Sequence, residues 1–166
     1  MLTTSLRSMR ALHGLLRQKL PSLRLLLQGE GAKSALISAF RADGNAVLVA
    51  TMSFWEGVDV PGEALRLVVL EKIPFAVPSD PVVLARSRVA EEQGKNPFME
   101  LHVPAAAITL KQGFGRLIRS RSDRGIVTLL DERVHRKGYG KRLLEALPEA
   151  RRTEALEDVK QFWSQA

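Results

Sequence analysis

The chain has 166 residues, a length typical of one folded domain, and 45% of them are hydrophobic. It contains no cysteine, which excludes disulfides, thiolate zinc sites and cysteine-held iron–sulfur clusters within this chain. No secretory signal pattern or run of roughly 18 apolar residues is present, so we expect a soluble, cytoplasmic protein without a membrane partner. The net charge of +7 favours a polyanionic partner such as nucleic acid.

Strand and helix patterns alternate along the chain. In chain order they predict a strand end at residues 2–5, a helix at 6–20, a strand at 23–27, a helix at 32–42, a strand at 46–50, a loop at 51–63, a strand at 65–70, a helix at 81–92, a helix opened by Pro104, a strand at 126–130, and helices at 139–147 and 155–163. This alternation predicts one α/β domain with a mainly parallel sheet and helices on both faces. Such sheets place their sites at the carboxyl ends of the strands.

The helix opened by Pro104 carries two glycines, Gly113 and Gly115, and each costs about 0.8 to 1 kcal/mol relative to alanine. At about 100° per residue, its polar sector contains Gln112, Gly115, Arg116 and Arg119. Its apolar stripe contains Ala107, Leu110, Phe114, Leu117 and Ile118. We therefore expect one face to pack on the core and the other to meet something that approaches closely. An ordinary surface helix with two solvated arginines is the alternative that this pattern leaves open.

The loop after the strand at 46–50 is the second informative segment. It contains Thr51, then Phe-Trp-Glu-Gly-Val-Asp at residues 54–59, and a Pro-Gly pair. The carboxylate of Asp59, held in a glycine- and proline-rich turn, can accept hydrogen bonds from ribose hydroxyls or orient an arginine. Trp55 stacks on a base, fills a gap between domains or packs in the core.

The spacing of the residues argues against two other kinds of site, a phosphate loop and a metal site. Residues 29–34, Gly-Glu-Gly-Ala-Lys-Ser, lack the G-x-x-x-x-G-K-[ST] spacing of a phosphate loop. His13, His102 and His135 are scattered without ligand spacing, so we predict no metal site in this chain.

Three separated segments resemble motifs of the XPD/DinG branch of superfamily 2 DNA helicases. Gln112, Gly115, Arg116 and Arg119, followed by Asp123 and Gly125, resemble motif VI. Residues 54–59 resemble motif V, and residues 2–5 match the end of motif IV. The order is correct and the likeness covers nearly the whole chain. Residues 1–166 therefore resemble the second, C-terminal RecA-like motor domain of a DinG or YoaA type helicase, with the N-terminal motor half absent.

The resemblance implies that ATP with Mg²⁺ lies between two RecA-like domains. It implies catalytic roles for three residues of this chain, with arginine fingers at Arg116 and Arg119 and a positioning role for Gln112. It places Glu56, Gly57, Asp59 and Gly115 at the nucleotide. It assigns the phosphates of single-stranded DNA to Thr3, Thr4, Ser5 and Thr51.

The leading interpretation is the C-terminal motor domain of an ATP-dependent DNA helicase that moves 5′ to 3′ on single-stranded DNA. Its expected partners are that DNA and the first RecA-like motor domain of the same protein. Because the Walker A and magnesium motifs are missing, we expect the isolated chain to be inactive as an ATPase. The alternatives are a stand-alone nucleic-acid-binding or regulatory module that kept the fold without catalysis and, less favoured, a small nucleotide-binding enzyme. The paired arginines favour the motor.

Overall fold

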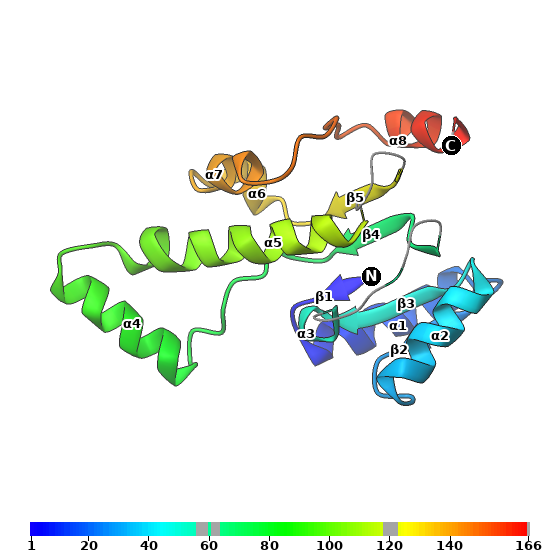
Figure 1. Ribbon diagram of the computed structural model, residues 1–166, viewed down its shortest axis with the longest axis horizontal. Helices are drawn as coiled ribbons and strands as arrows, with labels where there is room; N and C mark the ends of the chain where they lie inside the picture. Colours follow the sequence, from blue (N-terminus) through cyan, green and yellow to red (C-terminus); the bar gives the residue numbers. More distant parts are fainter. Residues whose placement is uncertain (56–59, 61–63, 118–122, 166) are drawn as a thin grey trace.

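The computed structural model describes the whole chain except residues 56–59, 61–63, 118–122 and 166 (Figure 1). Its five strands form one sheet in the order β2-β3-β1-β4-β5, and every pair is parallel. The strands are β1 Leu2–Thr3, β2 Leu25–Leu27, β3 Val47–Thr51, β4 Leu67–Leu70 and β5 Ile126–Leu129. The predicted parallel α/β sheet is confirmed.

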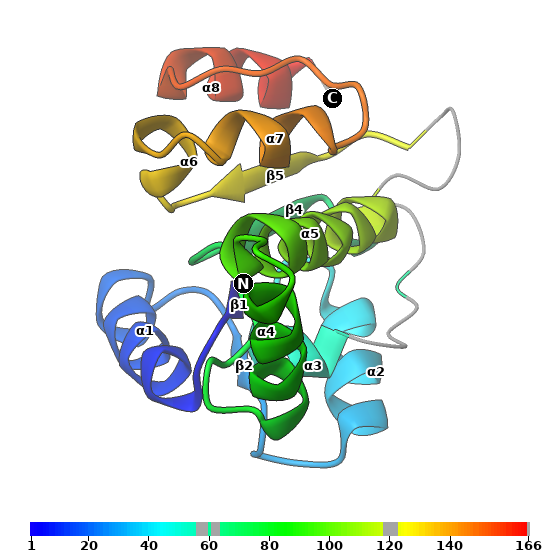
Figure 2. The same ribbon diagram turned by 90° about the vertical axis from the view of Figure 1, so that its left-hand side faces the viewer.

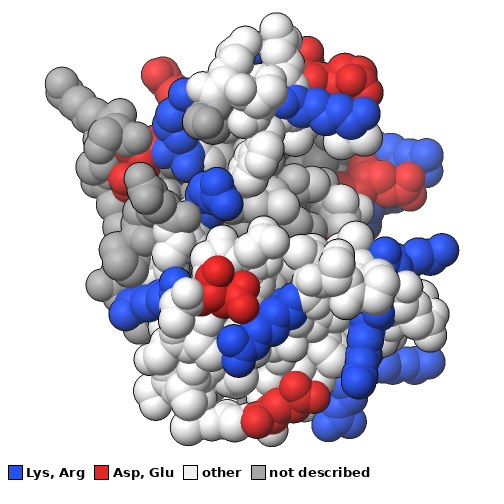
Figure 3. All heavy atoms as spheres, turned by 90° about the vertical axis from the view of Figure 1, so that its right-hand side faces the viewer, with Lys and Arg blue, Asp and Glu red and all other residues white. Residues whose placement is uncertain are grey.

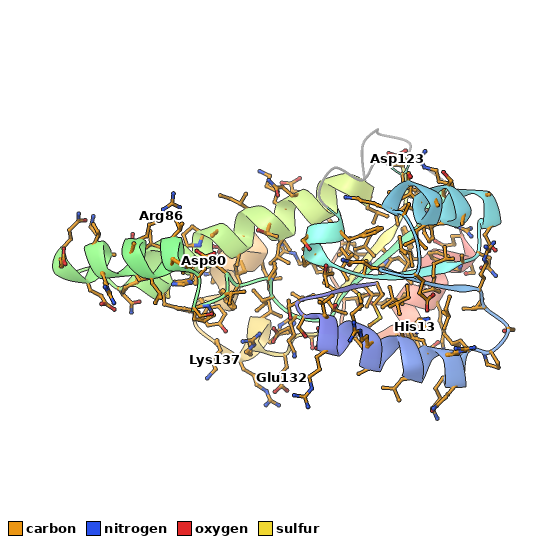
Figure 4. The ribbon with its side chains drawn as sticks, turned by 90° about the horizontal axis from the view of Figure 1, so that it is seen from below. His13, Asp80, Arg86, Asp123, Glu132 and Lys137 are labelled. Atoms are coloured by element: carbon orange, nitrogen blue, oxygen red, sulfur yellow. The ribbon has the colours of Figure 1, made fainter. Side chains whose placement is uncertain are left out.

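Helices cover both faces of this sheet (Figure 4). The helix α1, Leu6–Lys19, joins β1 to β2 and lies on one face, whereas α2, Lys33–Asp43, and α5, Val103–Leu117, lie on the other. The strand order explains the division, because crossovers between parallel strands are right-handed and the β1-to-β2 connection runs opposite to the β2-to-β3 and β4-to-β5 connections. No described helix is long and apolar enough to cross a membrane.

Local signals set several helix ends where the sequence predicts them. The hydroxyl of Ser5 accepts a hydrogen bond from the backbone N–H of Ser8 at 3.1 Å and begins α1. The carboxylate of Asp80 caps α4, Pro81–Glu92, in the same way. Gly44 ends α2 in the left-handed conformation, with φ of 70°, which glycine adopts without a steric penalty.

Three short helices do not follow the sequence prediction. The expected loop after β3 begins with α3, Met52–Trp55, and a one-turn helix, α6 Arg133–Arg136, follows β5. A π-helix, η2 Phe98–His102, runs directly into α5, which begins one residue before Pro104. The predicted closing helices are present as α7, Gly140–Glu145, and α8, Leu156–Ser164.

The core lies between the sheet and α5. Val103, Ala106, Leu110 and Leu117 of α5 are buried in one cluster with Leu2, Ala50, Val68 and Leu70 of the strands. Ala107 and Phe114 are half-buried, so the predicted apolar stripe is confirmed over the described residues; Ile118 lies outside them. By contrast, α4 and η2 extend away from the sheet (Figures 1 and 2).

Candidate functional site

The predicted site residues that the structure describes lie at two different edges of the sheet. Thr3 and Thr51 end β1 and β3, so they lie at the carboxyl edge. The helix α5 runs in the opposite direction, and at its end the side chain of Leu117 packs against Gly125, just before β5 begins. The expectation of one site at the carboxyl ends of the strands therefore fits the predicted nucleic-acid residues but not the last turn of α5.

At the carboxyl edge of the sheet, the side chain of Gln28 binds the end of β3 by hydrogen bonds. Its side-chain Oε1 accepts one hydrogen bond from the backbone N–H of Thr51 at 2.8 Å and a second from the Thr51 hydroxyl at 2.9 Å. The Thr51 hydroxyl also lies 2.9 Å from the hydroxyl of Ser53. Both donors of Thr51 are therefore engaged within the chain. In the sequence, Gln28 followed by Gly29 only suits the XPD/DinG likeness, and its contact with Thr51 is not predicted because that partner is 23 residues away.

The other predicted nucleic-acid residues differ in what they can offer to a ligand. Thr3 is fully buried, and its hydroxyl lies within hydrogen-bond distance of the carbonyl oxygens of Ser5 and Ala50. The Ser5 hydroxyl caps α1 and is exposed. Thr4 is also exposed, and its hydroxyl has no hydrogen-bond partner in the described part of the chain. Thr4 is thus the predicted residue best placed to donate to a phosphate oxygen.

On α5, Gln112 and Gly115 are exposed on the side that faces away from the core. A Cβ atom added at Gly115 or at Gly113 would meet no described heavy atom within 4 Å outside the helix's own backbone. The close approach expected at these glycines is therefore not made by the described part of the chain. Arg116 lies in the last turn of α5, but its side chain is outside the described residues, as is the whole of Arg119.

The predicted nucleotide-contacting residues Glu56, Gly57 and Asp59 also lie outside the described residues. The positions that flank them are anchored: Phe54 and Val60 are both buried in the core. The ammonium group of Lys33 lies 5.2 Å from the centroid of the Phe54 ring. The backbone of Trp55 ends α3, and its side chain is not described, so none of its predicted roles is tested.

An ion pair that sequence reasoning missed lies after β5, and its carboxylate also accepts a hydrogen bond from the segment after β4. The buried carboxylate of Asp131 accepts hydrogen bonds from Nε and Nη2 of Arg133, the latter at 2.6 Å, and from the backbone N–H of Ile73 at 3.0 Å. These bonds, led by those from Arg133, lower the pKa of Asp131 to about 2. An acidic residue directly after the last strand is the only signal of this pair in the sequence.

Charge does not gather into one continuous basic patch on the face shown in Figure 3. Lysine and arginine side chains are spread over this face and are interrupted by groups of acidic side chains. Among the described residues, no group of three or more histidine, aspartate or glutamate side chains could hold a metal ion.

The parallel sheet, the buried α5 stripe and the polar carboxyl edge define the class of protein as a RecA-like α/β domain. A family model for the helicase C-terminal domain matches residues 1–150. Two solved structures share the fold: an XPD helicase, with a TM-score of 0.64 and 22% identity over 87% of this chain and 26% of that chain, and the Xpd4 protein of S. tokodaii, with a TM-score of 0.60 and 19% identity over 89% of this chain and 28% of that chain.

Two curated relatives are similar over almost the whole chain. The ATP-dependent DNA helicase YoaA of Haemophilus influenzae is 47% identical over 97% of this chain, and YoaA of Escherichia coli is 46% identical over 98%. The chain belongs to the helicase C-terminal domain family, in its XPD/DinG branch. It spans only 25% of the length of either relative.

Proposed function

We propose that this chain is the C-terminal motor half of an ATP-dependent DNA helicase that moves 5′ to 3′ on single-stranded DNA. The observation that carries the proposal is the exposed face of α5, where Gln112 and Gly115 point away from the core with open space at Gly115. A helix that packs one side and leaves glycine on the other can lie close to a nucleotide or to a facing domain.

In this proposal Arg116, in the last turn of α5, and Arg119 act as arginine fingers. ATP, bound with Mg²⁺ between this domain and a first motor domain, supplies the phosphoryl group that is transferred to water. Negative charge develops on the phosphoryl oxygens, and a planar guanidinium stabilises that charge better than a lysine ammonium does. Gln112 positions the neighbouring groups. Asp59, Gly57 and Glu56 are proposed to contact the nucleotide, and the first domain would hold Mg²⁺.

Single-stranded DNA is proposed to lie at the carboxyl edge of the sheet. Thr4 and Ser5 present exposed hydroxyls there, at the start of α1. Thr51 and Thr3 act through the backbone that they hold in place, because their hydroxyls have partners within the chain. Hydroxyl and backbone N–H contacts of this kind bind the phosphate backbone with little sequence preference.

The test compares the isolated chain with a two-domain enzyme, in which this chain is joined to a first motor domain; the corresponding part of Escherichia coli YoaA can serve. Steady-state ATP hydrolysis is measured for both with and without single-stranded DNA. We expect no turnover by the isolated chain and DNA-stimulated turnover by the two-domain enzyme. Hydrolysis that stays with the isolated chain through purification would contradict the proposal, as would a two-domain enzyme that binds DNA but never hydrolyses ATP.

A further inference from the structure

The C-terminal helix α8 is attached to the domain by two aromatic residues that pack on arginines. None of its described residues is buried. The guanidinium of Arg124 lies 4.9 Å from the Phe162 ring centroid, and that of Arg66 lies 5.3 Å from the Trp163 ring centroid. Arg124 also donates a hydrogen bond from Nη1 to the carbonyl oxygen of Gln165 at 3.0 Å. The helix therefore contacts the segments that precede β4 and β5, on the side of the domain where the C-terminus lies (Figure 1).

The contact at Arg124 leads directly to the end of α5. Gly125 follows Arg124, and a Cβ atom at Gly125 would lie 2.7 to 2.8 Å from three side-chain carbons of Leu117. Only glycine allows this approach without displacing Leu117, which is itself buried. Leu117 is the residue after Arg116 in the last turn of α5. The chain of contacts therefore runs from Phe162 to Arg124, through Gly125 to Leu117.

We propose that α8 positions the end of α5, and with it Arg116, by holding Arg124 against the Phe162 ring and the Gln165 carbonyl. The proposal rests on the finger role proposed above for Arg116. Phe162 and Arg124 are positioning residues in this account, since they act through α5. The helix lies outside residues 1–150, the part of the chain that matches the helicase C-terminal domain.

The same helix provides a matched control. Trp163 stacks on Arg66 as Phe162 stacks on Arg124. Arg66, however, lies just before β4 and is not next to Gly125, the residue that packs on Leu117. Removal of either ring takes one aromatic contact from α8. Only the loss of the Phe162 ring should displace the end of α5.

The experiment uses the two-domain enzyme and measures kcat and KM for ATP, together with the melting temperature. Misplacing a catalytic group by about 1 Å can cost about a hundredfold in rate, and Phe162 is one of several contacts that hold this segment, so we expect Phe162→Ala to lower kcat by about tenfold. KM and the melting temperature should change little. Phe162→Tyr, which keeps the ring face, should restore kcat, and Trp163→Ala should leave kcat within about twofold.

A double variant separates this inference from the finger role. In a background that carries both Arg116→Lys and Arg119→Lys, Phe162→Ala should cause no further loss of kcat, because its effect passes through the two proposed fingers. The inference is overturned if Phe162→Ala alone has normal kcat, if Trp163→Ala has the same effect, or if the loss persists in the background without both fingers or follows the melting temperature. If Arg116→Lys alone has normal kcat, the proposed function fails first, and this inference fails with it.

Discussion

The side chain of Gln28 holds Thr51 by two hydrogen bonds, at 2.8 Å from the backbone N–H and 2.9 Å from the hydroxyl. The amide of Gln28 thereby links the loop after β2 to the end of β3, just before α3 begins. The position of this strand end therefore depends on a residue far from it in the sequence.

Gln28→Ala should destabilise the domain by about 1 to 3 kcal/mol, because it leaves a part-buried N–H of Thr51 without its acceptor. The free energy of unfolding from urea titration measures the loss. Gln18→Ala, at an exposed position of α1, is the matched control and should change stability by less than about 0.5 kcal/mol. Equal stability of the two variants would show that the Gln28 bonds do not hold the loop.

Thr4→Val should weaken the binding of single-stranded DNA to the two-domain enzyme by roughly threefold to tenfold, the value of one hydrogen bond. Thr4 is exposed, and in the described part of the chain its hydroxyl has no partner. Fluorescence anisotropy measures the affinity, which should also fall steeply with added salt. Thr109→Val is the control, because the Thr109 hydroxyl donates to Ala105 within α5. Unchanged affinity in Thr4→Val would remove Thr4 from the DNA track.

Gly115→Ala should separate stability from activity. Because no described atom opposes a Cβ there, alanine should stabilise the helix by up to about 1 kcal/mol. If a nucleotide or a facing domain approaches Gly115, ATP turnover should nevertheless fall. Gly14→Ala, at an equally open and exposed position of α1, should give a similar gain in melting temperature with normal turnover. Normal turnover in Gly115→Ala would show that nothing approaches this face closely.

Asp131→Asn should cost about 2 kcal/mol of unfolding free energy at neutral pH, since the pKa of Asp131 is lowered from 3.8 to about 2. A carboxyl with a lowered pKa in the folded state contributes its stability above the unfolded pKa and loses it as pH falls through the folded pKa. The difference between wild type and Asp131→Asn should therefore shrink between about pH 4 and pH 2.

Chemical denaturation at several pH values measures this difference. Glu132→Gln, which removes only an exposed ion pair with Arg136, is the control and should have little effect. A difference that stays constant across the same pH range would mean that Asp131 stabilises the domain by means other than its charge.

Local signals let the sequence predict much of the fold. Ser5, Asp80 and Gly44 each act on their own helix ends, so their effect can be read without knowing the tertiary structure. The alternation of strands and helices was enough to predict the parallel sheet with helices on both faces. The π-helix η2 was missed because its spacing matches neither the helical nor the strand period.

The site was less accessible to sequence reasoning because it depends on contacts between distant residues. Gln28 accepts hydrogen bonds from two donors of Thr51, and Gly125 packs on Leu117. Both contacts depend on how the strands and helices pack together. The sequence marks the glycines of α5 as unusual, yet only the structure shows that Gly115 is open while Gly125 is in close contact.

The most direct test of the account is the ATPase turnover of Arg116→Lys in the two-domain enzyme. Lysine keeps the charge but loses the planar fork, so kcat should fall by at least roughly a hundredfold, with nucleotide affinity, DNA affinity and melting temperature little changed. Arg86→Lys is the control and should have normal kcat, because Arg86 lies on α4, far from Asp123 (Figure 4). A near-normal kcat for Arg116→Lys, or a loss matched by unfolding, would contradict the claim that α5 presents a catalytic arginine.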